Sequence, residues 1–559
     1  MNKKRIIPFM LLPFILFGCG KNKNVYASSK NTIYEFTLDG DDAIITGLNS
    51  NYKNQTDIII PYSIDKHVVK RIENHSFEDV YRIKNVDMTK SKVEEIGQAA
   101  FKKCTNLLHI DYTDTITKIE ANCFEECTSL TSMDLSKCNL TEISDGLFTK
   151  CSGISSVTFP KTTKVIGSNI FTGCDGITEI DYSEYEIEEI GEKAFYNLTN
   201  LKDVTLSPTT KKIGAYAFAE SKKIQFLNFS NTEIEEIGEG AFSNCKALAN
   251  INLPNTVKTL GNKAFYYCSV LRKVDLSRTA IESIPEACFE LCRYFDADKN
   301  EGIKITLPIE LKAISAKAFY NSSLQLINIS KTVNSIADDA FRLCNKLEKI
   351  TVDENNLSYI IHKEALYTAN KEKLLVYPAA SKNTEFEVSQ DTKTINAYAF
   401  ADAVNLKTVN LESVKLTEIA GYTFMNCTSL TTVVVGADAA TGIKKIGTKA
   451  FFGCKALTSF NGEYSVLEIG ESAFYDCISL KEVYLGESTS LSKIDAEAFY
   501  NCNKLETLTL PGSLEIVGRA AFYNCGSVTS FTFGANKTAF DTLVTNNPDS
   551  GLDQFRDLI

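Results

Sequence analysis

The chain has 559 residues, of which 44% are hydrophobic and 23% charged, and its formal net charge is −11. This composition is that of a folded protein rather than a disordered one. The acidic balance argues against a nucleic-acid binder, which needs a basic face. Four His and no Trp leave little material for acid–base or metal chemistry, whereas the 17 Cys raise the question of disulfides or zinc.

Residues 1–18 are predicted to be a lipoprotein signal peptide. Lys3, Lys4 and Arg5 precede an apolar run that ends at Phe17. This run is shorter than the about 20 apolar residues that span a bilayer. The segment Leu16-Phe17-Gly18-Cys19 resembles a bacterial lipobox, in which the Cys is lipidated and becomes the mature N-terminus. The alternative is an ordinary signal peptide followed by a chance Cys.

Residues 19–32 are polar and are predicted to form a flexible tether. Together with the lipobox, this tether predicts an exported protein held at the bacterial surface by lipid on Cys19. The membrane could be the outer membrane or the cell membrane. Residues 33–75 contain short β-branched runs and are predicted to form capping strands before the repeats.

An Ala-Phe-x-x-Cys motif then recurs along the chain, and its first ten Phe are spaced alternately 24 and 23 residues apart. The repeat Phe are Phe77, Phe101, Phe124, Phe148, Phe171, Phe195, Phe218, Phe242, Phe265, Phe289, Phe319, Phe341, Phe400, Phe424, Phe451, Phe474, Phe499 and Phe522. The two blocks are residues 76–352 and 396–534, and residues 535–559 form a C-terminal cap or tail. Such a period indicates one repeat array rather than several globular domains.

Each unit combines three pieces. Leu201-x-x-Val204-x-Leu206 predicts a short strand, Ile213-Gly214 a turn, and Ala217-Phe218 with the following residues a single helical or 3₁₀ turn. One unit cannot bury its apolar face alone, so successive units must share a continuous core. The predicted fold is a repeat solenoid of about 18 turns of 23–24 residues with short parallel strands.

The unit resembles the BspA-like leucine-rich repeat of bacterial surface proteins, over about residues 33–534. The resemblance implies a protein-binding surface protein. Family members are adhesins that bind host matrix proteins or other bacteria, so the implied partner is an extracellular matrix or cell-surface protein. It implies no cofactor.

Thirteen Cys share one phase, three residues after the repeat Phe. They are Cys104, Cys127, Cys151, Cys174, Cys245, Cys268, Cys292, Cys344, Cys427, Cys454, Cys477, Cys502 and Cys525. Leu198, Ser221 and Ala403 occupy the same phase elsewhere, which favours buried free thiols that act as small apolar groups. No close Cys-x-x-Cys pair is present for zinc. Disulfides between neighbouring turns remain an alternative, because the spacing of stacked strands lies within their range.

Residues at equivalent positions of successive repeats form two candidate binding surfaces. The strand position between the buried Val and Leu carries acidic residues, and the strands are expected to line the concave side of the solenoid. These residues are Asp111, Asp134, Asp181 and Asp275. The position after the repeat Phe carries an aromatic stripe on four consecutive turns, formed by Phe452, Tyr475, Tyr500 and Tyr523. The alternatives are a solvated polar face and aromatic packing between turns.

The period is interrupted at residues 353–395, between the two blocks. Strand-like segments at 357–362 and 374–378 flank Thr368-Ala369-Asn370-Lys371-Glu372, which predicts an inserted β-hairpin and a partial repeat. This insertion could act as a hinge, a structural splice or a binding loop.

No phosphate-binding loop, His-Glu-x-x-His or Gly-x-Ser-x-Gly motif is present. The sequence therefore predicts a monomeric, non-enzymatic, lipid-anchored surface protein that binds another protein and no nucleic acid. The alternative is a structural envelope lipoprotein without a dedicated host ligand.

Overall fold

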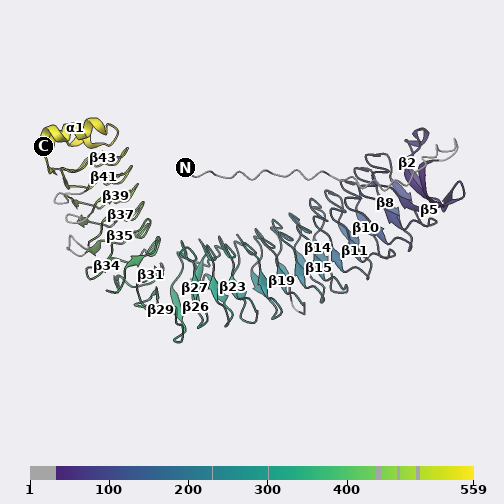
Figure 1. Ribbon diagram of the computed structural model, residues 1–559, viewed down its shortest axis with the longest axis horizontal. Coiled ribbons are helices and arrows are strands. Elements are labelled where there is room, and N and C mark those ends of the chain that lie inside the picture. Colours follow the sequence, from purple (N-terminus) through teal and green to yellow (C-terminus); the bar gives the residue numbers. More distant parts are fainter. Residues whose placement is uncertain (1–32, 230, 300, 436–441, 462–465, 486–490) are drawn as a thin grey trace, which may run out of the picture.

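The computed structural model describes residues 33–229, 231–299, 301–435, 442–461, 466–485 and 491–559. The described residues wind into a parallel β-solenoid of about 20 turns, which curves into an arc from the turns near β2 to the helix α1 (Figure 1). The predicted repeat fold is confirmed. The count exceeds the expected 18 turns because turns at the N-terminus and at residues 373–395 join the same stack.

The longer strand of each turn holds an apolar residue, in most turns the predicted Val or Ile, between two outward residues. It pairs in parallel with its counterpart in neighbouring turns. These strands are β3 (Asp57–Ile59), β6 (Asn85–Asp87), β8 (His109–Asp111), β10 (Ser132–Asp134), β12 (Ser156–Thr158), β14 (Glu179–Asp181), β16 (Asp203–Thr205), β18 (Phe226–Asn228), β20 (Asn250–Asn252), β22 (Lys273–Asp275), β24 (Ile303–Thr306), β26 (Leu324–Ile329), β28 (Lys349–Val352), β32 (Glu385–Glu387), β34 (Thr408–Leu411), β36 (Thr432–Val435), β38 (Ser459–Asn461), β40 (Glu482–Tyr484), β42 (Thr507–Leu510) and β44 (Ser530–Phe533).

A second, two-residue strand follows in each regular turn and ends in a buried residue, which is Ile in most turns. These strands are β7 (Glu95–Ile96), β9 (Lys118–Ile119), β11 (Glu142–Ile143), β13 (Val165–Ile166), β15 (Glu189–Ile190), β17 (Lys212–Ile213), β19 (Glu236–Ile237), β21 (Thr259–Leu260), β23 (Ser283–Ile284), β25 (Ala313–Ile314), β27 (Ser335–Ile336), β33 (Thr394–Ile395), β35 (Glu418–Ile419), β37 (Lys445–Ile446), β39 (Glu468–Ile469), β41 (Lys493–Ile494) and β43 (Ile516–Val517). The close approach of successive turns after this strand explains the Gly: a Cβ on Gly214 would lie 2.6 Å from the backbone of Gly191 in the previous turn.

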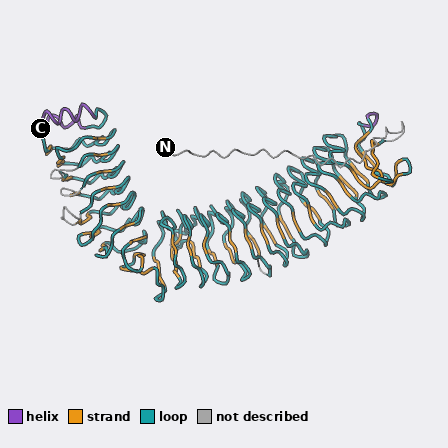
Figure 2. Tube along the Cα trace, viewed as in Figure 1, coloured by secondary structure: helices purple, strands orange, loops and turns teal. Residues whose placement is uncertain are grey.

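The Ala-Phe-x-x-Cys segment is not the predicted helical turn but a pair of hydrogen-bonded turns that stack like strands (Figure 2). The Phe101 N–H donates to the Cys123 carbonyl in the next turn at 2.9 Å, and the Lys103 N–H to the Glu125 carbonyl at 2.7 Å. Positive φ recurs two residues before and two after the repeat Phe, as at Lys103 (φ 59°), and this interrupts any helix.

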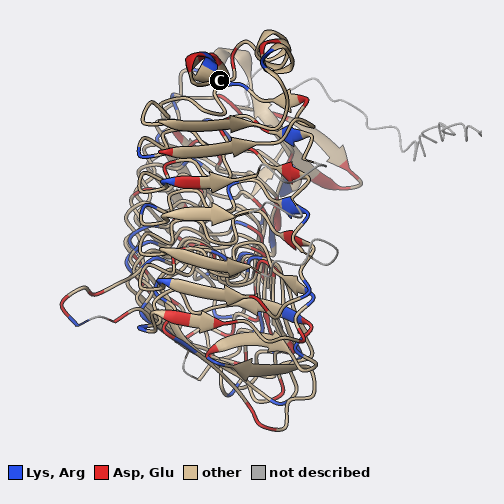
Figure 3. Cartoon of the chain, turned by 90° about the vertical axis from the view of Figure 1, so that its left-hand side faces the viewer, with Lys and Arg blue, Asp and Glu red and all other residues tan. Residues whose placement is uncertain are grey.

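In the second block, the longer strands lie on the outer side of the arc. Figure 3 looks at this block from outside, and the sheet that includes β32, with its two red Glu positions, faces the viewer. The expectation that these strands line the concave side is therefore wrong for this block. In a solenoid with bulky helices the strand side is forced inward, but here the opposite turns also stack at strand-like spacing.

The core contains two runs of stacked aromatic rings, which we call the phenylalanine stack. The first runs from Phe77 to Phe341 with ring centroids 5.0 to 5.9 Å apart. The second runs from Tyr377 to Phe522 with spacings of 5.0 to 5.3 Å. Tyr377 thus occupies a Phe position that the repeat search missed.

Both ends of the stack are covered. At the N-terminus, β1 (Tyr34–Asp39) pairs antiparallel with β2 (Asp42–Leu48), which is followed by η1 (Ser50–Tyr52), β4 (Ser63–Ile64) and β5 (His67–Ile72). At the C-terminus, α1 (Lys537–Asn546) and η2 (Leu552–Leu558) pack over the last turn. Tyr34 lies edge-on to Phe77 and Phe555 edge-on to Phe522, so each terminal ring of the stack is shielded.

The junction, residues 353–395, carries three antiparallel strands instead of the single expected hairpin. They are β29 (Tyr359–His362), β30 (Ala365–Thr368) and β31 (Lys373–Val376), and β31 then pairs in parallel with β33. The additional turn arises because Lys363 and Glu364 form a tight connection with positive φ at both residues.

The junction divides the core in two. Leu366 and Leu375 belong to the core of the first block, whereas Tyr367 and Leu374 belong to that of the second. Because side chains alternate along a strand, β30 and β31 present one face to each core. This arrangement corresponds to a structural splice.

The 16 described Cys are all buried and free, so none forms a disulfide. The ladder thiols also have a role that the sequence analysis missed, because each donates a hydrogen bond to the repeat Phe carbonyl one turn earlier. The Cys268 thiol, for example, lies 3.3 Å from the Phe242 carbonyl. Ser221 replaces Cys in this phase and donates to the Phe195 carbonyl at 2.9 Å.

Removal of one stacked ring should destabilise the solenoid, because the cavity cannot close between rigid neighbours. We expect Phe242→Ala to lower the free energy of unfolding by about 3–5 kcal/mol, since Phe242 is fully buried. The control Phe226→Ala removes a ring that is 68% exposed and should change stability by less than about 0.5 kcal/mol. Urea denaturation followed by circular dichroism measures both, and equal losses would contradict the role of the stack.

Burial also makes stability depend on alkaline pH. It raises the pKa of Cys104, Cys151 and Cys292 from 9.0 to about 12 in the folded protein. Above pH 9 the unfolded chain loses these protons while the folded chain keeps them, so stability is full below pH 9 and falls as pH rises toward 12. Each such thiol contributes a loss of about 1.4 kcal/mol per pH unit in this window.

We therefore expect the urea midpoint to fall clearly between pH 8.5 and 10.5. Thiol titration should detect the 16 described Cys after denaturation and almost none in the native protein at pH 8. A constant midpoint, or clearly fewer than 16 titratable thiols, would be inconsistent with a ladder of buried thiols.

Candidate functional site

The four acidic candidates lie at the outward ends of the longer strands in the first block. Three of them accept a backbone hydrogen bond from the serine two positions later: Asp134 from Ser136 at 2.9 Å, Asp181 from Ser183 at 3.0 Å, and Asp275 from Ser277 at 3.1 Å. This local pattern is an Asx turn that ends the strand. Most of these carboxylates therefore have a structural role.

Electrostatics agree with that reading for Asp275. The Ser277 hydroxyl donates to its carboxylate at 2.7 Å, and this bond together with the Ser277 N–H lowers the Asp275 pKa below its ordinary value. Asp111 differs, because its exposed carboxylate makes no hydrogen bond or ion pair with the described residues. Among the four, Asp111 is the one most available to a partner.

The aromatic stripe forms a continuous stack of parallel rings. Ring centroids are 5.0 Å apart for Phe452 and Tyr475, 4.6 Å for Tyr475 and Tyr500, and 4.9 Å for Tyr500 and Tyr523. The first three side chains are half-buried, and Tyr523 is 57% exposed. Packing between turns and exposure to solvent therefore coexist, so the stripe presents a row of ring edges at the surface.

A second pair of rings was missed by the sequence analysis. Tyr398 and Tyr422 stack at 4.5 Å with their planes 5° apart, and the Arg342 guanidinium lies 4.7 Å from the Tyr398 ring. Both Tyr stand two residues before a repeat Phe. That shared phase was the signal that could have revealed the pair.

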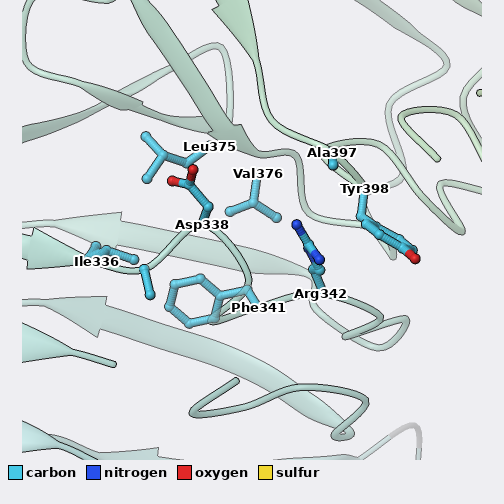
Figure 4. Close-up of a pocket in the computed structure, with 9 residues that line it drawn as sticks. Ile336, Asp338, Phe341, Arg342, Leu375, Val376, Ala397 and Tyr398 are labelled. Carbon is cyan, nitrogen blue, oxygen red and sulfur yellow. The ribbon is translucent and has the colours of Figure 1, made fainter. Parts of the chain in front are cut away.

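A narrow crevice lies between the blocks beside this pair (Figure 4). Asp338, Phe341 and Arg342 line it from the first block, whereas Val376 and Tyr398 face them across the gap. The Lys373 ammonium pairs with the Asp338 carboxylate at 2.7 Å and joins the two sides. These contacts hold the two sides of the crevice together. The remaining space is too small for a ligand larger than a water molecule.

The described residues were also considered as ligands for a metal ion and as acid–base pairs. No group of three or more His, Cys, Asp or Glu in that part could hold a metal ion. The His are dispersed: His75 contacts Glu78 at 2.6 Å, and His362 lies edge-on to Tyr367. No helix among the described residues is both long and apolar enough to cross a membrane. The predicted lipidation site, Cys19, lies outside the described residues.

The chain is similar to several solved structures. A leucine rich cell surface protein from Faecalibacterium prausnitzii A2-165 is 20% identical, with coverage of 94% of this chain and 99% of that one and a TM-score of 0.40. A leucine-rich repeat protein from Bacteroides ovatus ATCC 8483 is 22% identical, with coverage of 89% and 97% and a TM-score of 0.36. The pneumococcal vaccine antigen PcpA is 14% identical, with coverage of 91% and 98% and a TM-score of 0.38.

No curated protein matches the chain. The family model described as "BspA type Leucine rich repeat region" matches residues 50–178, 175–296, 299–378, 377–441 and 437–548. These matches extend over most of the solenoid, including the junction. The chain therefore belongs to the BspA-type leucine-rich repeat family.

Proposed function

We propose that this protein is exported, is anchored to the bacterial surface through lipid on Cys19, and binds a protein partner with its repeat solenoid. The observation that carries the binding proposal is the aromatic stripe. Its rings are ordered by mutual stacking, yet their edges reach solvent on four successive turns. Tyr is enriched at protein interfaces because it offers a large contact area with few rotatable bonds.

The rigidity of the stripe supports this role. Each ring is already fixed by its neighbours, so binding would cost little side-chain entropy. The acidic strand face contributes less, since Asp134, Asp181 and Asp275 are engaged in Asx turns. The proposed partner is a protein of the extracellular matrix or of another cell surface, which would make the chain an adhesin.

The anchor proposal rests on the sequence around Cys19. We expect Cys19→Ala to move the protein from the detergent phase to the aqueous phase when cells that produce it are extracted with Triton X-114, because the acyl chains are lost. The matched control is Cys138→Ser, which also removes one thiol but leaves the lipobox intact. Detergent-phase partition of the Cys19 variant would refute the lipid anchor.

The binding proposal is tested by capture of matrix proteins and cell-surface extracts on the immobilised full chain. We expect the triple variant Tyr475→Ser, Tyr500→Ser and Tyr523→Ser to lose the captured partner by at least tenfold while its circular dichroism spectrum is retained. The control changes Tyr196, Tyr266 and Tyr320 to Ser. These residues share the phase but belong to no run of four consecutive aromatic turns.

Capture that persists in the stripe variant would exclude this surface. Capture of nothing by the wild-type chain would favour the alternative of a structural envelope lipoprotein. Loss of the fold in the stripe variant alone would favour the alternative that the rings serve packing between turns.

A further inference from the structure

The junction creates a trough of about 680 Å³ on the outward face of the longer strands. Its floor consists of outward side chains from three successive strands, including Glu385 and Glu387 on β32, Asn410 on β34 and Val434 on β36. Its wall is the two-residue connection between β29 and β30, Lys363 and Glu364. Strands β29 and β30, which carry this wall, belong to the junction and recur in none of the regular turns that the structure describes.

The wall is fastened to the floor. The Lys363 ammonium pairs with the Glu387 carboxylate, and the Ser381 hydroxyl donates to the Glu364 carboxylate at 2.6 Å. Lys363 and Glu364 have φ of 45° and 76°, a conformation that two-residue hairpin turns usually assign to Asn or Gly. Two long charged side chains stand there instead, so this turn presents charge beside the sheet.

The trough carries a net negative charge. Glu364, Glu385 and Glu387 face one cation, Lys363, which is already paired with Glu387. The Glu385 carboxylate makes no ion pair or hydrogen bond with any described residue and is exposed. Because Glu385 and Glu387 are two residues apart on one strand, they point to the same side at a separation of about 7 Å.

We propose that this trough binds an extended, basic segment of the protein partner, with Lys or Arg at alternate positions. In an extended chain, alternate side chains also repeat every 7 Å or so, which matches the spacing of the two Glu. Opposite charges on facing strands are favourable and like charges unfavourable, so the floor selects cations. The inference rests on the proposed protein-binding function and specifies the partner's chemistry.

A matched site without the wall exists in the first block. Strand β14 also carries two acidic outward residues, Glu179 and Asp181, but Asp181 is engaged by Ser183 and no inserted turn stands beside it. If acidity alone attracted a basic segment, β14 would bind it as well as β32. The difference between the two strands isolates the contribution of the trough.

The test uses the full chain in detergent and a fluorescein-labelled eight-residue peptide of alternating Thr and Lys, followed by fluorescence anisotropy. The double variant Glu385→Gln and Glu387→Gln keeps the side-chain shape and removes two charges. We expect it to raise the dissociation constant about tenfold, since each exposed ion pair contributes modestly. Glu179→Gln should leave the constant within twofold, and a peptide of alternating Thr and Glu should not bind.

Binding by the wild type should also weaken severalfold between 50 and 300 mM NaCl, because salt screens exposed charges. The proposal is overturned if the wild type does not bind the basic peptide, if the double variant binds within twofold of it, or if Glu179→Gln has an equal effect. Unchanged thermal unfolding of the double variant excludes misfolding as the cause of any loss. A partner still captured through the aromatic stripe would then uphold the proposed function while the trough alone fails.

Discussion

The whole architecture depends on one constraint: each turn must lie on the previous turn at the distance between hydrogen-bonded strands. Each turn has three sides that satisfy this constraint by hydrogen bonding to the next turn. They are the longer strand, the two-residue strand and the turns around the repeat Phe. The phenylalanine stack tolerates this distance because its rings overlap at 5.0 to 5.9 Å in the first block. Inward positions of successive turns therefore carry similar side chains. A side chain that does not fit disturbs the packing of both neighbouring turns.

The thiol ladder shows how closely this constraint specifies chemistry. The group at that phase must tolerate full burial, and the Cys and Ser found there also donate to a carbonyl one turn away. Cys268 is buried and donates through its thiol, and Ser221 is buried and donates through its hydroxyl. A buried donor to a backbone carbonyl satisfies a polar group that water cannot reach. Burial in turn raises the thiol pKa and keeps the Cys protonated and unreactive.

Periodicity in the sequence predicted the solenoid, because stacking requires apolar inward residues that recur at a fixed spacing along the chain. What it could not predict depends on three-dimensional relations. The turn around Phe101 resembles a helical turn in sequence, but positive φ at Lys103 and bonds to the next turn decide its form. Tyr377 was missed because neither the Ala before it nor the Cys after it is present.

Candidate sites were harder to predict for the same reason. Asp134 looked like a free surface acid, yet its carboxylate closes a turn within two residues. The stacked geometry of the aromatic stripe followed correctly from the shared phase of its residues, because rings at one phase must lie over one another. Stacking does not restrict the side chains at outward positions in the same way. The sequence alone therefore does not predict which outward side chains lie beside an inserted turn or contact a neighbouring residue.

The junction is the place where the chain departs most from the regular repeat. The phenylalanine stack passes from one run to another there, and the strands β30 and β31 face a different core on each side. The extra residues between Phe289 and Phe319 in the first block leave the stack unbroken, since these two rings still stack at 5.7 Å. At the junction the inserted strands themselves supply the missing apolar faces, so the extra turn at Lys363 and Glu364 can project without opening the core. The junction thus adds a surface feature to a repeat protein without disturbing its uniform interior, because the inserted strands carry their own packing, and the trough lies beside them.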